Sequence, residues 1–204
     1  MQKLKQRLAD YFLIALGPLW VAVAMYVLAK GEAWALFWNA ELFKENPYLV
    51  FVVMPLGLGL IRFATLHLAP QAGGSGMPQV MAVIHMGHRV RSSLHTLISP
   101  LQALIKGVMV VLGMLCGASI GREGPAVQIG AAVMTGWSLG AVKRVRIDPR
   151  TLAIIGGAAG LASAFTTPLA GAMYAFEELG SRRHFRSRSF ALLCIVLSAW
   201  ARYR

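Results

Sequence analysis

Two acidic sites stand out because they interrupt long apolar stretches. Glu123 follows Arg122 within Gly121-Arg122-Glu123-Gly124-Pro125, and Glu177-Glu178 closes a later apolar run. Ionisable side chains at membrane depth are functional candidates by default. A carboxylate at a helix N-terminus would occupy the same favourable potential as an anion, so Glu123 could compete with an anion and leave when protonated. This pattern predicts a gate that also carries a proton.

Structural alternatives exist for both acidic sites. Glu123 could form an ion pair with Arg122, since intramembrane charges often pair. Glu177 and Glu178 lie before Arg182 and Arg183 and could form salt bridges with them. Carboxylates at a helix C-terminus oppose the helix dipole, which favours the other interpretation, an internal proton station. Residue types and spacing leave these alternatives open.

A third site is the segment Gly74-Ser75-Gly76-Met77-Pro78. Its glycines free the backbone, and its proline suits the first turn of a helix, where an N–H is not needed. We expect Ser75 at the cap of that helix, where its hydroxyl and the neighbouring amides can donate to a dehydrated halide. The alternative is an ordinary N-cap serine.

Two other chemistries fit parts of the same region. Gly73-Gly74-Ser75-Gly76 matches a GxSG pattern, with His85, His88 and His95 downstream, as in an intramembrane serine protease. Nucleophilic catalysis needs a base within reach of the serine, but these histidines follow on the same short segment, so we expect no enzyme. His85 and His88 share a helix face without a nearby carboxylate or cysteine, so we expect no metal site and no cofactor.

The composition favours a membrane protein. Of the 204 residues, 57% are apolar and 14% are charged, whereas soluble domains are about 25% charged. The net charge of +12 comes from basic clusters beside apolar segments, which is typical of cytoplasmic flanks and argues against nucleic-acid binding. We expect a multi-pass protein of the cell inner membrane with a cytoplasmic N-terminus, and a loop carrying Glu32, Glu41 and Glu45 between the first two spans.

The apolar segments must hold these sites, and several are too short to cross a bilayer. In chain order they are about Tyr11–Ala29, Tyr48–Leu68, Gln79–Gly87, Leu101–Ile120, Ala126–Val142, Thr151–Phe165, Leu169–Leu179 and Phe190–Tyr203. Broken helices at membrane depth survive only inside protein or beside a cavity, and their N-termini favour anions. Three such ends are predicted: the Ser75 segment, the Glu123 segment, and the run through Gly156, Gly157 and Gly160.

Three motifs resemble those of the CLC chloride channel and transporter family. The Ser75 segment is similar to its GSGIP signature, 121–128 to GREGPxVQ, and 157–171 to its GAAAGLAAAFNAPLAG stretch. The resemblance implies an all-α polytopic membrane protein with broken and re-entrant helices. It covers the N-terminal inverted-repeat half of the family fold, so 1–204 forms a single transmembrane domain.

The resemblance also implies roles for individual residues. Ser75, with Gly76 and Gly124, is similar to the chloride-binding set, and Glu123 to the gating glutamate. Glu178 is similar to the inner proton-transfer glutamate, and Glu177 to its neighbour. Because passive family members usually lack the inner acid, the resemblance favours proton-coupled chloride exchange, and retention of Ser75 favours chloride.

The expected partners are chloride, protons and the lipid bilayer. The resemblance implies a second half that completes the chloride site, and residues 1–204 match only the first half. The resemblance therefore predicts a homodimer if the protein is complete, or a complementary C-terminal half. The alternatives are a non-transporting remnant or assembly module, and half of a passive channel.

Overall fold

The computed structural model describes residues 16–85, 97–141, 148–174 and 177, and every regular element in this part of the chain is helical. The elements are α2 (Gly17–Glu45), η1 (Pro47–Leu49), α3 (Val50–Leu68), η2 (Pro70–Ala72), α4 (Met77–His85), α6 (Pro100–Leu115), α7 (Glu123–Ala141), α8 (Pro149–Phe165) and α9 (Pro168–Tyr174). The predicted all-α class is confirmed.

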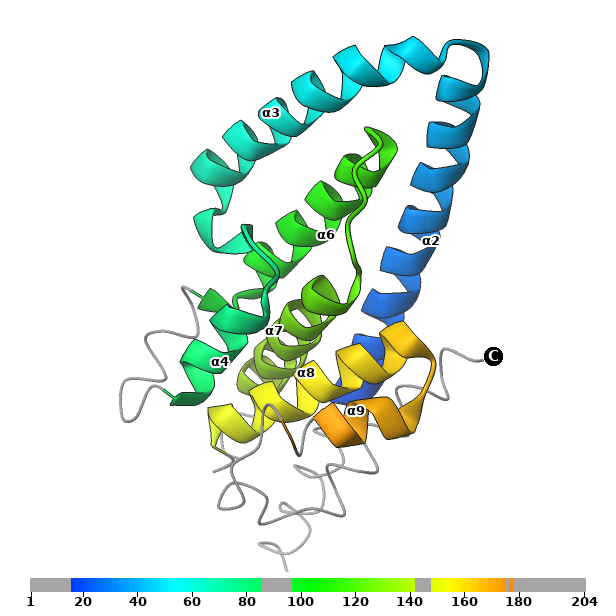
Figure 1. The fold of residues 1–204 in the computed structure, drawn as a ribbon. Coiled ribbons are helices and arrows are strands. Elements are labelled where there is room, and N and C mark those ends of the chain that lie inside the picture. The colour runs from blue at the N-terminus through cyan, green and yellow to red at the C-terminus, as the bar shows by residue number, and fades with distance from the viewer. Residues whose placement is uncertain (1–15, 86–96, 142–147, 175–176, 178–204) are drawn as a thin grey trace, which may run out of the picture.

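Helices α2 and α3 extend away from a bundle that contains α7 and α8 (Figure 1). In Figure 1, α2 and α3 meet at one end of the molecule, and α6 rises between them. The helices α7 and α8 pack together at the other end, with α4 and α9 beside them. Within the described residues, Gly17–Glu45 and Pro47–Leu68 are long and apolar enough to cross a membrane.

The first predicted span ends too early. Helix α2 continues past Ala29 to Glu45, so the predicted loop from Ala29 to Tyr48 is wrong over most of its length. Lys30, within this helix, is exposed, and its Nζ lies 5.5 Å from the centre of the Tyr26 ring. Glu32 is buried inside the molecule at 5% exposure, so it is a packed helical residue and not a loop acid. The residues before 16 lie outside the described part.

The broken helices are confirmed, with shifted boundaries. Helix α4 has only 9 residues, and α6 stops at Leu115 instead of the predicted Ile120. Gly117, with φ +96°, ends α6: its N–H donates to Met114 O and the Ala118 N–H donates to Gly113 O, which is the Schellman arrangement. Helix α7 begins at Glu123, three residues before the predicted start.

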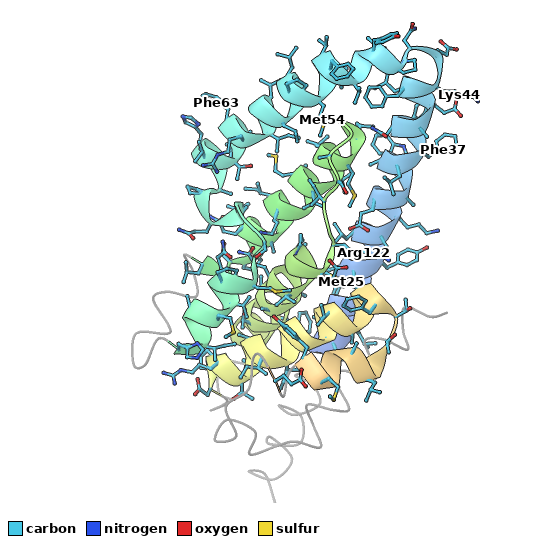
Figure 2. The ribbon with its side chains drawn as sticks, in the orientation of Figure 1. Met25, Phe37, Lys44, Met54, Phe63 and Arg122 are labelled. Atoms are coloured by element: carbon cyan, nitrogen blue, oxygen red, sulfur yellow. The ribbon has the colours of Figure 1, made fainter. Side chains whose placement is uncertain are left out.

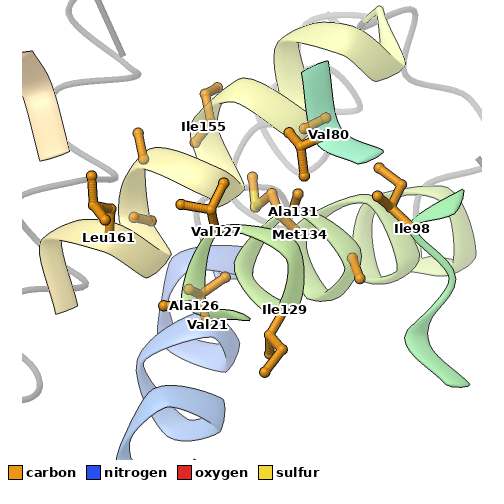
Figure 3. Close-up of a cluster of buried hydrophobic side chains, with 14 of the residues drawn as sticks. Val21, Val80, Ile98, Ala126, Val127, Ile129, Ala131, Met134, Ile155 and Leu161 are labelled. Atoms are coloured by element: carbon orange, nitrogen blue, oxygen red, sulfur yellow. The ribbon is translucent and has the colours of Figure 1, made fainter. Parts of the chain in front are cut away.

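The predicted helix end near Gly156 is wrong. Gly156, Gly157 and Gly160 lie inside α8, and Gly156 and Gly160 allow it to pack closely on α7. A Cβ placed on Gly160 would meet the carbonyl oxygen of Ala126 and come within 3.3 Å of Gly130 Cα. Small residues at such positions let membrane helices approach each other closely. Figure 3 shows the resulting core, in which α7 and α8 pack with residues of α2 and α4.

Helix α8 ends at a residue in an unfavourable conformation. Thr166 has φ +55° and ψ +25°, in the left-handed region that β-branched residues rarely adopt. The related motif has asparagine at this position, and asparagine tolerates this region. We expect Thr166→Asn to stabilise the protein by about 1 kcal/mol, measured as a higher unfolding temperature in detergent. Thr167→Asn, at a position without positive φ, is the control, and equal shifts would contradict the explanation.

Candidate functional site

Two predicted helix starts, the Ser75 segment and the Glu123 segment, contact each other. A Cβ placed on Gly124, in the first turn of α7, would lie 3.0 Å from the carbonyl carbon of Ser75 and 3.1 Å from its Cβ. A Cβ on Gly76, whose φ is +100°, would lie 2.9 Å from the carbonyl oxygen of Gly124. Both positions therefore require glycine, and the fold brings together Ser75, Gly76 and Gly124.

A buried lysine holds the loop that carries Ser75. Lys106 in α6 is 2% exposed, and its Nζ donates to the carbonyl oxygens of Ala72 and Gly74 at 2.9 Å each. Sequence reasoning missed this residue. The signal was present, because Lys106 is the one charged side chain within the predicted apolar segment Leu101–Ile120.

Two glutamine side chains complete this support. Gln79 Nε2 donates to Gly73 O at 2.9 Å and to Gln71 O at 3.4 Å. Gln128, which is fully buried in α7, donates from Nε2 to Gln71 O at 3.1 Å and to Leu97 O at 3.0 Å. With Lys106, side chains thus bind each loop carbonyl from Gln71 to Gly74, and this fixes the orientation of the loop.

Several donors remain available on this loop. The backbone N–H groups of Gly74, Ser75 and Gly76 donate to no residue in the described part of the chain. Ser75 is exposed, and its hydroxyl has no partner among the described residues either. By contrast, Ser99 caps α6, because its Oγ accepts a hydrogen bond from Gln102 N at 3.2 Å. The expected cap position of Ser75 is wrong by one residue, because Gly76 O accepts the first helical bond, from Val80 N at 3.3 Å. Unused donors at a helix N-terminus are the elements of an anion site.

Glu123 is the first residue of α7, and its side chain turns back toward the preceding loop. Its Oε2 lies 2.8 Å from a Cβ placed on Gly121. The carboxylate makes no hydrogen bond or ion pair with a described residue. Arg122 Nη1 instead lies 3.8 Å from Glu32 Oε2, so the alternative Arg122–Glu123 pair is not formed. Figure 2 shows Arg122 at the start of α7, beside α2.

No pattern of residue types or spacing indicated Glu32 as the partner of Arg122. Glu32 lies in α2, far from Arg122 along the chain, and only the packing of α2 on α7 brings them together. This contact links the segment just before Glu123 to a buried carboxylate. Arg122 is therefore held away from the Glu123 side chain, and the Glu123 carboxylate is free to interact with a ligand in the neighbouring cavity.

A cavity of about 670 Å³ joins these groups. It lies between α3, the Ser75 loop, α6 and the segment leading into α7. Its polar and charged lining residues are Arg62, Thr65, Ser75, Lys106, Ser119 and Glu123. The remaining lining is apolar or glycine, so an anion in this cavity would meet backbone amides, hydroxyl groups and cations in largely apolar surroundings.

Other predicted site residues are not brought into this cavity. Glu177 is exposed and does not line it, and Glu178 lies outside the described residues. His85 is also absent from the lining, and its Nδ1 lies 2.8 Å from Met81 O in its own helix. His88 and His95 are outside the described part. No group of three or more potential metal ligands occurs among the described residues.

Comparisons with known proteins agree on one family. A family model described as voltage gated chloride channel matches residues 50–203. The H(+)/Cl(-) exchange transporter ClcA of Vibrio vulnificus strain YJ016 is 33% identical over 155 residues, covering 74% of this chain and 31% of the relative. ClcA of Vibrio cholerae El Tor Inaba N16961 is 35% identical over 147 residues, which cover 71% of this chain and 29% of that relative.

The fold also has a solved counterpart. A crystal structure described as a slow cyanobacterial Cl-/H+ antiporter superposes with a TM-score of 0.76 at 24% identity, covering 94% of this chain and 45% of the other. The chain spans about a third of the length of the curated relatives it matches, 31% for the Vibrio vulnificus protein. The structural likeness supports the predicted arrangement of broken helices.

Proposed function

Because this chain belongs to the voltage-gated chloride channel family, and is therefore a multi-pass membrane protein, we propose that it forms part of a chloride pathway in a proton-coupled exchanger. The main support for this proposal is the cavity, which is lined by both Ser75 and Glu123. The backbone amides at the starts of α4 and α7 form the positive ends of these helix dipoles, and they would stabilise a chloride ion. The curated relatives, named H(+)/Cl(-) exchange transporters, support the choice of ions.

In the proposed mechanism, chloride is bound by Ser75 Oγ and by the backbone N–H groups of Gly76 and Gly124. The Glu123 carboxylate competes with chloride for the same positive potential, because Glu123 is the first residue of α7. Its carboxylate contacts no other charged side chain among the described residues. Protonation removes its charge, so the side chain leaves the anion path and chloride takes its place. Protons and chloride then move in opposite directions through one site.

Glu178 is the proposed inner proton station, with Glu177 near the proton entry. This assignment rests on the motif resemblance, since Glu178 lies outside the described residues. The basic clusters in the sequence support a cytoplasmic N-terminus in a bacterial inner membrane. A homodimer or a complementary second half is the proposed assembly, because family members complete the chloride site with a second half.

Replacing Glu123 by glutamine is expected to leave chloride flux but abolish coupled proton movement, because the amide cannot take up and release the proton. Chloride efflux and pH would be recorded together from liposomes containing the purified chain. Glu178→Gln should block proton movement while chloride flux continues. Glu41→Gln, an exposed helical position paired with Lys44 at 3.7 Å, is the control.

Each outcome of this assay has a distinct meaning. Proton movement that persists in Glu123→Gln would remove the gate role, and unchanged proton flux in Glu178→Gln would remove the inner station. Chloride flux without proton movement in the unmodified chain would favour the passive channel. No flux from a folded, inserted chain would favour the remnant or assembly role.

A further inference from the structure

Arg62 places a second cationic side chain in the cavity. It lies in α3, which forms one wall, and its Nη1 is 3.7 Å from a Cβ placed on Gly73, next to the Ser75 loop. Arg62 belongs to none of the three motifs. It lies within the predicted span Tyr48–Leu68, and a charge in a span is a functional candidate.

The guanidinium has no protein partner in the described part of the chain. No hydrogen bond or ion pair joins Arg62 to a described residue, and its side chain is exposed. The other cation of the cavity differs, because Lys106 uses two of its three N–H bonds on the Ala72 and Gly74 carbonyls. Arg62 therefore has more donors to offer a ligand than Lys106 has.

The charge balance of the cavity favours an anion at this position. Among the described residues that line it, Glu123 is the one carboxylate, set against the two cations Arg62 and Lys106. Protonation of Glu123 leaves both cations without any negative lining group. The cavity then carries two positive charges and no negative charge among its described lining residues, and this net charge attracts a mobile counter-ion.

We propose that Arg62 binds a small monovalent anion on the α3 wall of the cavity, forming an anion station in addition to the one at Ser75. The inference rests on the proposed function for the identity of the ion, for which chloride is the probe. An ion at Arg62 would lie beside the Gly73–Ser75 loop, so it would be positioned to exchange with an ion at the Ser75 donors. Arg62 would also raise the local anion concentration in the cavity.

The test is protection of Arg62 from an arginine-modifying reagent. The full chain in detergent would be treated with phenylglyoxal in potassium chloride or in potassium gluconate of equal ionic strength, and modification would be measured by peptide mass spectrometry. Arg122 is the internal control, because its side chain is 49% exposed but is paired with Glu32 and does not line the cavity. We expect chloride to slow modification of Arg62 alone, by about tenfold at about ten times the dissociation constant.

Equal Arg62 modification rates in the two salts would mean that Arg62 only faces solvent, and would overturn the proposal. Arg62→Gln and Arg62→Lys provide a second measurement, by calorimetric titration of chloride. We expect the heat of binding to fall in Arg62→Gln and to be retained in Arg62→Lys. Protection of Arg62 requires no transport, so this test is independent of the proposed function. Protection without chloride flux would support the Arg62 anion station but not the proposed function. Flux without protection would contradict the Arg62 station and leave the proposed function standing.

Discussion

Gly156→Ala is expected to destabilise the fold by about 3 kcal/mol, because the added methyl group meets atoms that cannot move aside. A Cβ on Gly156 would lie 2.5 Å from Met134 Cβ and 2.9 Å from the Ala131 Cα, and it would also meet the Gly130 carbonyl oxygen. These atoms belong to α7, whose first residue is Glu123. Separation of α7 from α8 would therefore displace the site as well as the core.

The measurement is the temperature at which the detergent-solubilised variant loses its monodisperse chromatographic peak. The matched control is Gly59→Ala, since a Cβ on Gly59 in α3 would meet nothing within 4 Å. Alanine is also the better helix former, so the control should equal or exceed the unmodified chain in stability. Equal stability of the two variants would show that α7 and α8 do not pack as described.

Lys106→Met is expected to weaken chloride binding by at least about tenfold, the equivalent of one lost charge-assisted hydrogen bond of about 1.5 kcal/mol. The substitution keeps the apolar length of the side chain but removes both hydrogen bonds to the Ala72 and Gly74 carbonyls. The Ser75 loop then loses its fixed orientation, and the cavity loses a positive charge. Calorimetric titration of chloride into the purified variant measures the change.

Two further variants keep this prediction testable. Lys44→Met removes an exposed lysine whose pair with Glu41 is 3.7 Å long, and such surface pairs contribute little, so chloride binding should be unchanged. If Lys106→Met fails to fold, Gln79→Leu removes donors to Gly73 and Gln71 at the same loop and should weaken binding less. Unchanged chloride affinity in a folded Lys106→Met would contradict the positioning role.

Sequence patterns predicted the local features of the site well. Gly76 and Pro78 indicated the start of α4, and Glu123 was correctly expected at a helix N-terminus. These features depend on backbone preferences of a few adjacent residues, which is why residue types reveal them. Composition and the short, interrupted apolar runs indicated a membrane protein with broken helices, and the motif resemblance implied the all-α class of fold.

The missed features depend on contacts between distant segments. Glu32 reads as a loop acid until the packing of α2 on α7 brings it to Arg122. Lys106 reads as a break in an apolar run, and its carbonyl partners are supplied by a loop more than 30 residues earlier. The glycines around Gly156 resemble a helix end because glycine both breaks helices and lets them pack, and only the neighbouring helix α7 decides between these roles.

The proposed mechanism requires Glu123 and chloride to compete for one site. Chloride would be titrated calorimetrically into the purified chain and into Glu123→Gln at the same pH. We expect severalfold tighter chloride binding in Glu123→Gln, because the competing negative charge at the start of α7 is gone. Equal affinities in the two proteins, or no chloride binding by either folded chain, would contradict it.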